Sequence, residues 1–112
     1  MARILVVDDE KKIRDVLKFA LRSQAYGVIL AKDGFEAFNS YRNSPADLIM
    51  TDMQMPGMNG LQLINKIREI NPNQHVLLMS GNKMPKEWSG PFIEKPFSLA
   101  KLFLIVSRVL SS

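Results

Sequence analysis

Residues 47–60 read DLIMTDMQMPGMNG and combine a short apolar run with an acid and a cluster of turn-forming residues. The run from Leu48 to Met50 has the length and flanks typical of a strand that is buried on both faces of a parallel sheet. Asp52 would then lie at the carboxyl end of this strand, where open α/β folds bind their ligands. The pattern therefore makes Asp52 a candidate functional carboxylate.

The length, composition and charge of the chain exclude several classes of protein. A chain of 112 residues with 46% hydrophobic and 23% charged residues fits one globular domain, residues 1–112. No segment approaches the roughly 20 apolar residues of a membrane span, and the N-terminus lacks a signal peptide, so we expect no membrane insertion. The absence of cysteine excludes disulfides and thiolate metal sites and fits a cytoplasmic protein. The net charge of +4 is scattered over helix faces, which indicates a solvated surface.

Apolar runs alternate with amphipathic segments along the whole chain. The pattern predicts strands at 4–7, 28–30, 48–50, 76–79 and 92–93, and helices at 10–23, 35–42, 61–70 and 99–110. The buried helix faces are expected to include Ile13, Val16, Leu17, Phe35, Phe38, Tyr41, Ile70 and Leu99. Asp9 is placed to cap the first helix. This alternation predicts a doubly wound parallel sheet, because right-handed crossovers lay helices on both faces.

Polar residues follow four of the five predicted strands. Asp8 and Asp9 follow the first strand, Asp52 the third, Ser80 the fourth and Lys95 the fifth. The carboxyl ends of parallel strands share one edge of the sheet, so these side chains should converge there. Each residue alone has an ordinary explanation, as a helix cap, a turn residue or a surface lysine. The hypothesis of a site rests on their joint occurrence.

The converging residues indicate phosphoryl-transfer chemistry. Three neighbouring carboxylates raise one another's pKa unless a cation lies between them. Mg²⁺ prefers such oxygen ligands together with water and phosphate. Lys95 supplies an ammonium for a phosphate oxygen and Ser80 a hydroxyl donor. With Asp52 as the nucleophile, the product would be an aspartyl-phosphate.

Four motifs together resemble the receiver domain of two-component response regulators, of the chemotaxis type with a single domain. They are VVDDE at residues 6–10, TDMQMPGMNG at 51–60, SG at 80–81 and EKPF at 94–97. The resemblance covers essentially the whole chain in the family's order. It implies a flavodoxin-like five-stranded sheet in the order 2-1-3-4-5 with five helices. It also implies Mg²⁺-dependent phosphoryl transfer from a histidine kinase or histidine phosphotransfer protein to Asp52, which shifts the domain from an inactive to an active conformation.

The resemblance also assigns roles to individual residues. Metal ligands would be Asp52, Asp9, Asp8 through water, and the carbonyl of Gln54. The phosphoryl group would be held by Lys95, Ser80 and the backbone N–H groups of Met53 and Gly81. Phe92 would be the switch aromatic, or else a plain core residue of the fifth strand. Gln54 and Asn82 occupy positions that tune hydrolysis of the phosphoryl group, and the Lys95–Pro96 peptide is expected to be cis.

One segment departs from the family. Only eleven residues, Gly81 to Pro91, separate Ser80 from Phe92, which is near the lower limit of about 10–12 for a parallel crossover. The segment also holds two glycines and two prolines. We therefore predict that the family's fourth helix is very short or missing. Trp88 would either cover the thinned edge of the core or form a partly exposed contact.

Three functions remain open at this level. The first is a phospho-accepting receiver, which acts only on its own phosphorylation and is otherwise not an enzyme. The second is a small Mg²⁺-dependent phosphatase of the haloacid dehalogenase type, although Gln54 stands where that family has a second acid. The third is a receiver-like interaction module that is never phosphorylated. No helix-turn-helix follows Leu110, so we expect no direct DNA binding and an unknown protein target. His75 is expected to be structural.

Overall fold

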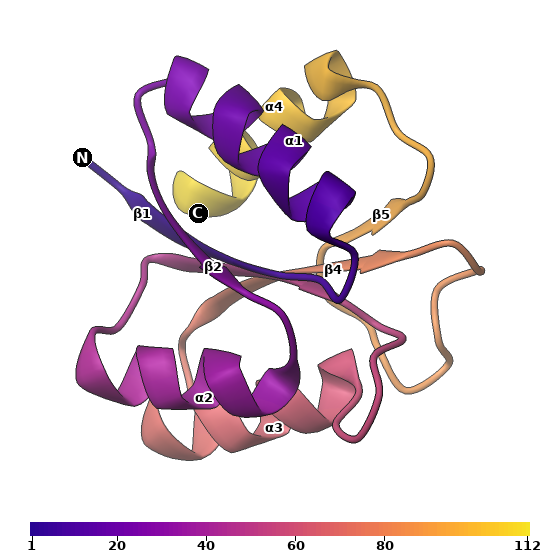
Figure 1. Cartoon of the computed structure of the whole chain (residues 1–112). Helices are drawn as coiled ribbons and strands as arrows, with labels where there is room; N and C mark the ends of the chain where they lie inside the picture. Colours follow the sequence, from indigo (N-terminus) through magenta and orange to yellow (C-terminus); the bar gives the residue numbers. More distant parts are fainter.

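The computed structural model describes residues 1–112, in which five strands and four helices alternate for most of the chain (Figure 1). The elements are β1 (Arg3–Val7), α1 (Lys11–Ser23), β2 (Gly27–Ala31), α2 (Gly34–Asn43), β3 (Leu48–Asp52), α3 (Gly60–Ile70), β4 (His75–Ser80), β5 (Phe92–Glu94) and α4 (Leu99–Leu110). All strand pairs are parallel, and the sheet order is β2-β1-β3-β4-β5. The predicted fold class and strand order are confirmed.

The sheet is covered on both faces. Figure 1 shows α1 and α4 on one side and α2 and α3 on the other. Successive strand residues point to opposite faces: Ile4 and Val6 of β1 pack with Leu17 and Leu102, whereas Leu5 belongs to the core on the opposite face. Every residue of β3 is buried, as expected for the central strand. None of the helices has the length and apolar character needed to cross a bilayer.

Side-chain caps begin three of the four helices. Asp33, Asn59 and Ser98 each accept a hydrogen bond from a backbone N–H in the first turn of α2, α3 and α4. The first helix differs, because its N-cap residue is Glu10 and no side chain caps it. The prediction that Asp9 caps α1 is therefore wrong. The Asp9 carboxylate is instead directed to the cluster described below.

Some apolar residues assigned to buried helix faces are exposed. Val16 is 54% exposed, Phe35 61%, Ile70 53% and Leu99 42%. Phe35 lies in the first turn of α2, and its ring packs over Gly57, where an added Cβ would approach the ring to 2.9 Å. Gly57 has φ of +80°, a conformation that glycine adopts readily. Phe35 therefore contacts the loop after β3 and lies outside the core.

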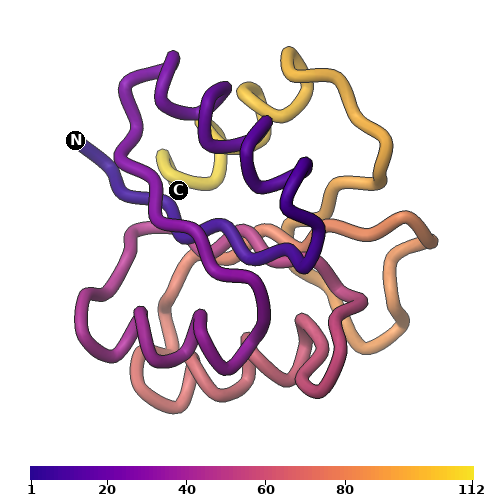
Figure 2. Tube along the Cα trace, viewed as in Figure 1, coloured from indigo at the N-terminus to yellow at the C-terminus, as the bar shows by residue number.

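No helix lies between β4 and β5, which confirms the prediction for residues 81–91. Figure 2 shows this segment as a loop that leaves the sheet and returns to it. Trp88 in this loop is buried and packs into the core on the α2–α3 side. Its indole N–H donates to the Pro91 carbonyl at 2.9 Å, and the Arg68 guanidinium lies 5.3 Å from its ring centroid. Trp88 thus covers the core edge, the first of its two predicted roles.

Candidate functional site

The register of the sheet aligns the strand ends that carry the predicted site. Val7 is paired with Thr51, Asp52 with Met79, and Ser80 with Glu94. The residues that follow β1 and β5 therefore lie beside Asp52 and Ser80. The strand ends bring Asp8, Asp52 and Lys95 into direct interaction at this edge of the sheet.

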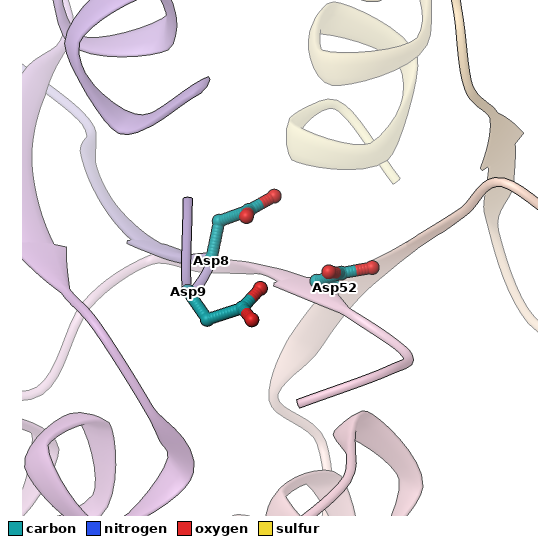
Figure 3. Close-up of side chains that lie close together, drawn as sticks. All are labelled: Asp8, Asp9 and Asp52. Carbon is teal, nitrogen blue, oxygen red and sulfur yellow. The ribbon is translucent and has the colours of Figure 1, made fainter. Parts of the chain in front are cut away.

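Three carboxylates form the centre of the site. One oxygen each of Asp8, Asp9 and Asp52 lies within 4.8 Å of the others. Figure 3 shows Asp8 and Asp9 from the turn after β1, and Asp52 from the end of β3, gathered at one place. Asp8 is fully buried and Asp52 is 7% exposed, whereas Asp9 is exposed. The cluster is therefore open to solvent on the side of Asp9.

Lys95 bridges two of these acids. Its Nζ lies 2.7 Å from Asp8 Oδ2 and 3.5 Å from Asp52 Oδ2. Burial opposes the charge of the ammonium, but the hydrogen bond to Asp8 and the charges of both acids outweigh burial, so the pKa of Lys95 is raised. The lysine is therefore held in its charged form, and the shorter contact shows that Asp8 is its main partner.

Asp52 lies in an environment that disfavours its charge. Burial raises the pKa of the Asp52 carboxyl, and the nearby charges of Asp8 and Asp9 raise it further. Lys95 and the backbone of Gln54 act in the opposite direction without cancelling the increase. One ammonium thus faces three carboxylates, and a further cation would relieve the remaining repulsion.

The donor set fits a hard divalent cation. Carboxylate and carbonyl oxygens with access to water are the ligands that Mg²⁺ prefers. Asp9 and Asp52 offer oxygens to this site, and the backbone N–H of Gln54 donates to the Asp52 carboxyl, whereas the Gln54 carbonyl stays a predicted ligand. Asp8 is less available for direct coordination, because Oδ1 accepts from the Glu10 N–H at 2.9 Å and Oδ2 from Lys95. This arrangement supports a role for Asp8 through water.

The remaining predicted residues lie on β4 and β5 or directly after β3 and β4. Ser80 is buried at the end of β4, and its Oγ accepts a hydrogen bond from the Asn82 N–H at 3.0 Å. The N–H of Met53 donates to the Met79 carbonyl at 2.8 Å, so it is engaged in this conformation. Gly81 borders open space, where an added Cβ would meet no atom within 4 Å. Phe92 is half-buried against the same core as Trp88.

Two features of the site were not predicted. An added Cβ at Gly60 would lie 2.4 Å from the Asp52 carbonyl oxygen, so α3 starts in direct contact with the strand end. Arg14 of α1 donates from Nη1 to the Asp8 carbonyl at 2.7 Å. Gly60 lies within the TDMQMPGMNG motif, but its spacing alone does not reveal the contact. The only sequence signal for Arg14 is a basic residue in the second turn of the predicted helix.

A parallel sheet in this order, with acids and a lysine at its carboxyl edge, defines a flavodoxin-like α/β domain. Comparison with known proteins specifies the family. The model of the response regulator receiver domain matches residues 4–107. The chain therefore belongs to the response regulator receiver domain family, and the predicted resemblance is confirmed. The Lys95–Pro96 peptide is cis, as the resemblance implied.

Solved structures of similar proteins agree with this assignment. The chemotaxis protein CheY4 of Vibrio cholerae superposes with a TM-score of 0.92 at 27% identity, covering 97% of this chain and 98% of that one. The response regulator TrrA of Thermotoga maritima, solved in complex with Mg²⁺ and BeF, gives a TM-score of 0.90 at 31% identity. That comparison covers 97% of this chain and 99% of TrrA.

Curated relatives are longer than this chain. The DNA-binding transcriptional regulator NtrC of Azospirillum brasilense is 34% identical, over 99% of this chain but only 24% of its own length. The response regulator MprA of Mycobacterium sp. (strain KMS) is 31% identical, over 89% of this chain and 46% of its own length. The chain thus spans about a quarter to a half of such relatives.

Proposed function

We propose that the domain accepts a phosphoryl group on Asp52 from a phosphohistidine of a histidine kinase or a histidine phosphotransfer protein. The observation that carries this proposal is the cluster of Asp8, Asp9 and Asp52 with Lys95 bridging two of its members. An Asp52 oxygen attacks phosphorus, a P–O bond forms and the P–N bond of the donor breaks. The leaving imidazole keeps the electron pair of that bond and takes up a proton. The domain has no other substrate in this proposal.

Each residue has a defined task in this step. A Mg²⁺ ion held by Asp9, Asp52 and the Gln54 carbonyl would neutralise charge on the transferred group. Lys95 already lies 3.5 Å from Asp52, so a small movement away from Asp8 brings its ammonium to a phosphoryl oxygen. The backbone N–H of Gly81 would be a second donor to the phosphoryl group. Met53 would contribute its N–H only after its bond to Met79 lengthens.

The conformational response would begin at Ser80. In the structure its Oγ accepts from the Asn82 N–H, so a change of the Ser80 rotamer that moves Oγ toward a phosphoryl oxygen would break this bond. The start of the 81–91 loop is then released, and Phe92 beyond it responds through the shared core. A phosphoryl group supplies about −1.5 to −2 charges and strong acceptors to drive this change. Gln54 and Asn82 would influence how quickly water removes it.

The phosphodonor has an apolar surface to bind beside the site. A groove of about 390 Å³ lies next to Lys95, lined by Ile13, Val16, Leu17, Pro96, Phe97 and Leu99. Val16 and Leu99 are both exposed there. A partner that covers this groove would bring its histidine to Asp52 and exclude water. We place this exchange in the cytoplasm, in keeping with the cysteine-free sequence.

The test uses acetyl phosphate with Mg²⁺ and intact mass spectrometry. We expect a single phosphoryl adduct on the wild type that is absent in Asp52→Asn and absent when EDTA replaces Mg²⁺. A labelled phosphohistidine donor should transfer its label with the same requirements. Turnover of added phosphomonoesters would indicate the phosphatase alternative instead. No adduct with either donor would indicate an interaction module that is not phosphorylated.

A further inference from the structure

Asp8 is held by hydrogen bonds at each of its polar groups. Its N–H donates to the Ala31 carbonyl at 3.2 Å, and its two carboxylate oxygens accept from Glu10 and Lys95. The fourth contact comes from Arg14, whose Nη1 donates to the Asp8 carbonyl at 2.7 Å. Three of these contacts belong to the sheet, the turn or the acid site itself. The contact from Arg14 differs, because it comes from a side chain of α1 that lies outside the acid cluster.

The contact from Arg14 fixes the geometry of the next residue. The Asp8 carbonyl and the Asp9 N–H belong to the same planar peptide unit. Holding that carbonyl in one direction therefore restricts how the Asp9 backbone, and with it the Asp9 carboxylate, is presented to Asp52. No side chain caps α1, so this turn lacks the capping bond of the other three helices and is held instead by Arg14 and by the hydrogen bond from the Glu10 N–H to Asp8 Oδ1. The hydrogen bond from the charged Arg14 guanidinium to the Asp8 carbonyl is strong enough to stabilise the turn.

We propose that Arg14 is a positioning residue of the cation site, which orients the Asp8–Asp9 peptide so that Asp9 faces Asp52. This inference rests on the proposed Mg²⁺ site. Arg14 has two opposing effects on the affinity for Mg²⁺. Its positive charge repels an incoming cation, whereas its hydrogen bond preorganises a ligand. Salt at 0.15 M screens the charge effect only in part, because Arg14 contacts Asp8 well within the Debye length of about 8 Å. We expect preorganisation to outweigh the repulsion that remains.

The test is a Mg²⁺ titration by calorimetry at 0.15 M salt, with Arg14→Met as the main variant. Methionine keeps the aliphatic bulk and removes both the charge and the hydrogen bond. We expect the Kd for Mg²⁺ to rise about tenfold, the low end of the loss found when groups that orient metal ligands are removed. Arg14→Lys retains a donor and should recover part of the affinity. In metal-free amide spectra, the signal of Asp9 should shift in Arg14→Met.

Arg22→Met is the matched control, because Arg22 is an exposed residue in the last turn of the same helix and carries the same charge. Its Kd for Mg²⁺ should stay within twofold of the wild-type value. Tighter Mg²⁺ binding by Arg14→Met would show that charge repulsion dominates and would overturn the inference. An unchanged Kd with a lower Tm would reduce Arg14 to a structural role. Failure of the wild type to bind Mg²⁺ would refute the proposed metal site instead.

Discussion

At the scale of single residues, the three gathered carboxylates can bind a cation, but their burial and mutual repulsion lower the stability of the folded domain. Asp52 is almost fully buried near two other carboxylates, and its raised pKa reports that its charged form is disfavoured in the folded state. Such groups are common at functional sites, where the arrangement needed for chemistry differs from the most stable one. Gly60 carries no charge, but it lies so close to the Asp52 carbonyl that a larger residue at this position would displace the backbone.

Asp52→Asn should stabilise the metal-free protein at pH 7.5. A carboxyl whose pKa is raised on folding contributes stability that is fully present below its unfolded pKa and lost as pH rises through its folded pKa. Asparagine avoids this loss, so we expect a gain of about 0.5–2 kcal/mol in the free energy of unfolding. Urea unfolding from pH 3.5 to 7.5 checks this, and the difference should grow with pH. A less stable variant at pH 7.5 would contradict it.

Gly60→Ala should destabilise the domain, although alanine is the better helix former. The new Cβ would lie 2.4 Å from the Asp52 carbonyl and 3.0 Å from the Met53 Cα, so backbone has to move. We expect a loss of about 1–3 kcal/mol in urea unfolding, as for other overpacked sites. Gly81→Ala is the matched control, because nothing lies within 4 Å of its added Cβ. Equal stability of the two variants would exclude the steric explanation.

At the scale of elements, apolar runs predicted the five strands and helical periodicity the four helices, and the shortness of segment 81–91 predicted the missing helix. Their ends were less predictable. The apolar run stops at Met50, but β3 continues to Asp52, because its ladder with β4 extends to Met79. The predicted burial of Phe35 was also wrong, since the sequence pattern cannot show that the loop at Gly57 lies against α2. These details depend on contacts between segments that are distant in the sequence.

Trp88→Ala should cost about 3 kcal/mol, because it removes a large buried side chain where a helix is missing. Trp88→Phe should lose less, since a smaller aromatic ring stays under Arg68 and only part of the buried indole and the hydrogen bond to Pro91 are removed. Chemical unfolding followed by circular dichroism measures both. Met84→Ala, at a 47% exposed position of the same loop, should change stability by no more than about 0.5 kcal/mol. If Trp88→Ala matched Met84→Ala, Trp88 would not support the core.

At the scale of the whole molecule, the meeting of distant residues at one edge could be predicted because parallel strands share a direction. Asp8, Asp9, Asp52 and Lys95 are brought together as the strand ends require. The pattern could not predict that Lys95 pairs more closely with Asp8 than with Asp52, or that Arg14 reaches the Asp8 carbonyl. These two contacts depend on side-chain conformations, which are determined by how the helices pack on the two faces of the sheet.

Mg²⁺ should stabilise the whole domain by linkage. A cation that binds only the folded state at 100 times its Kd adds about 2.7 kcal/mol to the free energy of unfolding. We expect Tm to rise with Mg²⁺ concentration in the wild type and to rise less in Asp52→Asn, which has lost one carboxylate. Thermal unfolding at constant ionic strength, with Na⁺ as the compensating ion, provides the measurement. An identical rise in both proteins would show that the ion binds elsewhere.

The placement of Trp88 also has a practical consequence. The chain contains one tryptophan, and it is located between Ser80 and Phe92, on the loop that would respond to phosphorylation. Its indole is stacked with a guanidinium and shielded from solvent. The intensity and wavelength of its emission would therefore follow the packing of this loop against the core, in an unlabelled protein and on the timescale of stopped-flow mixing. The domain carries its own fluorophore at the point where a change of state would first spread.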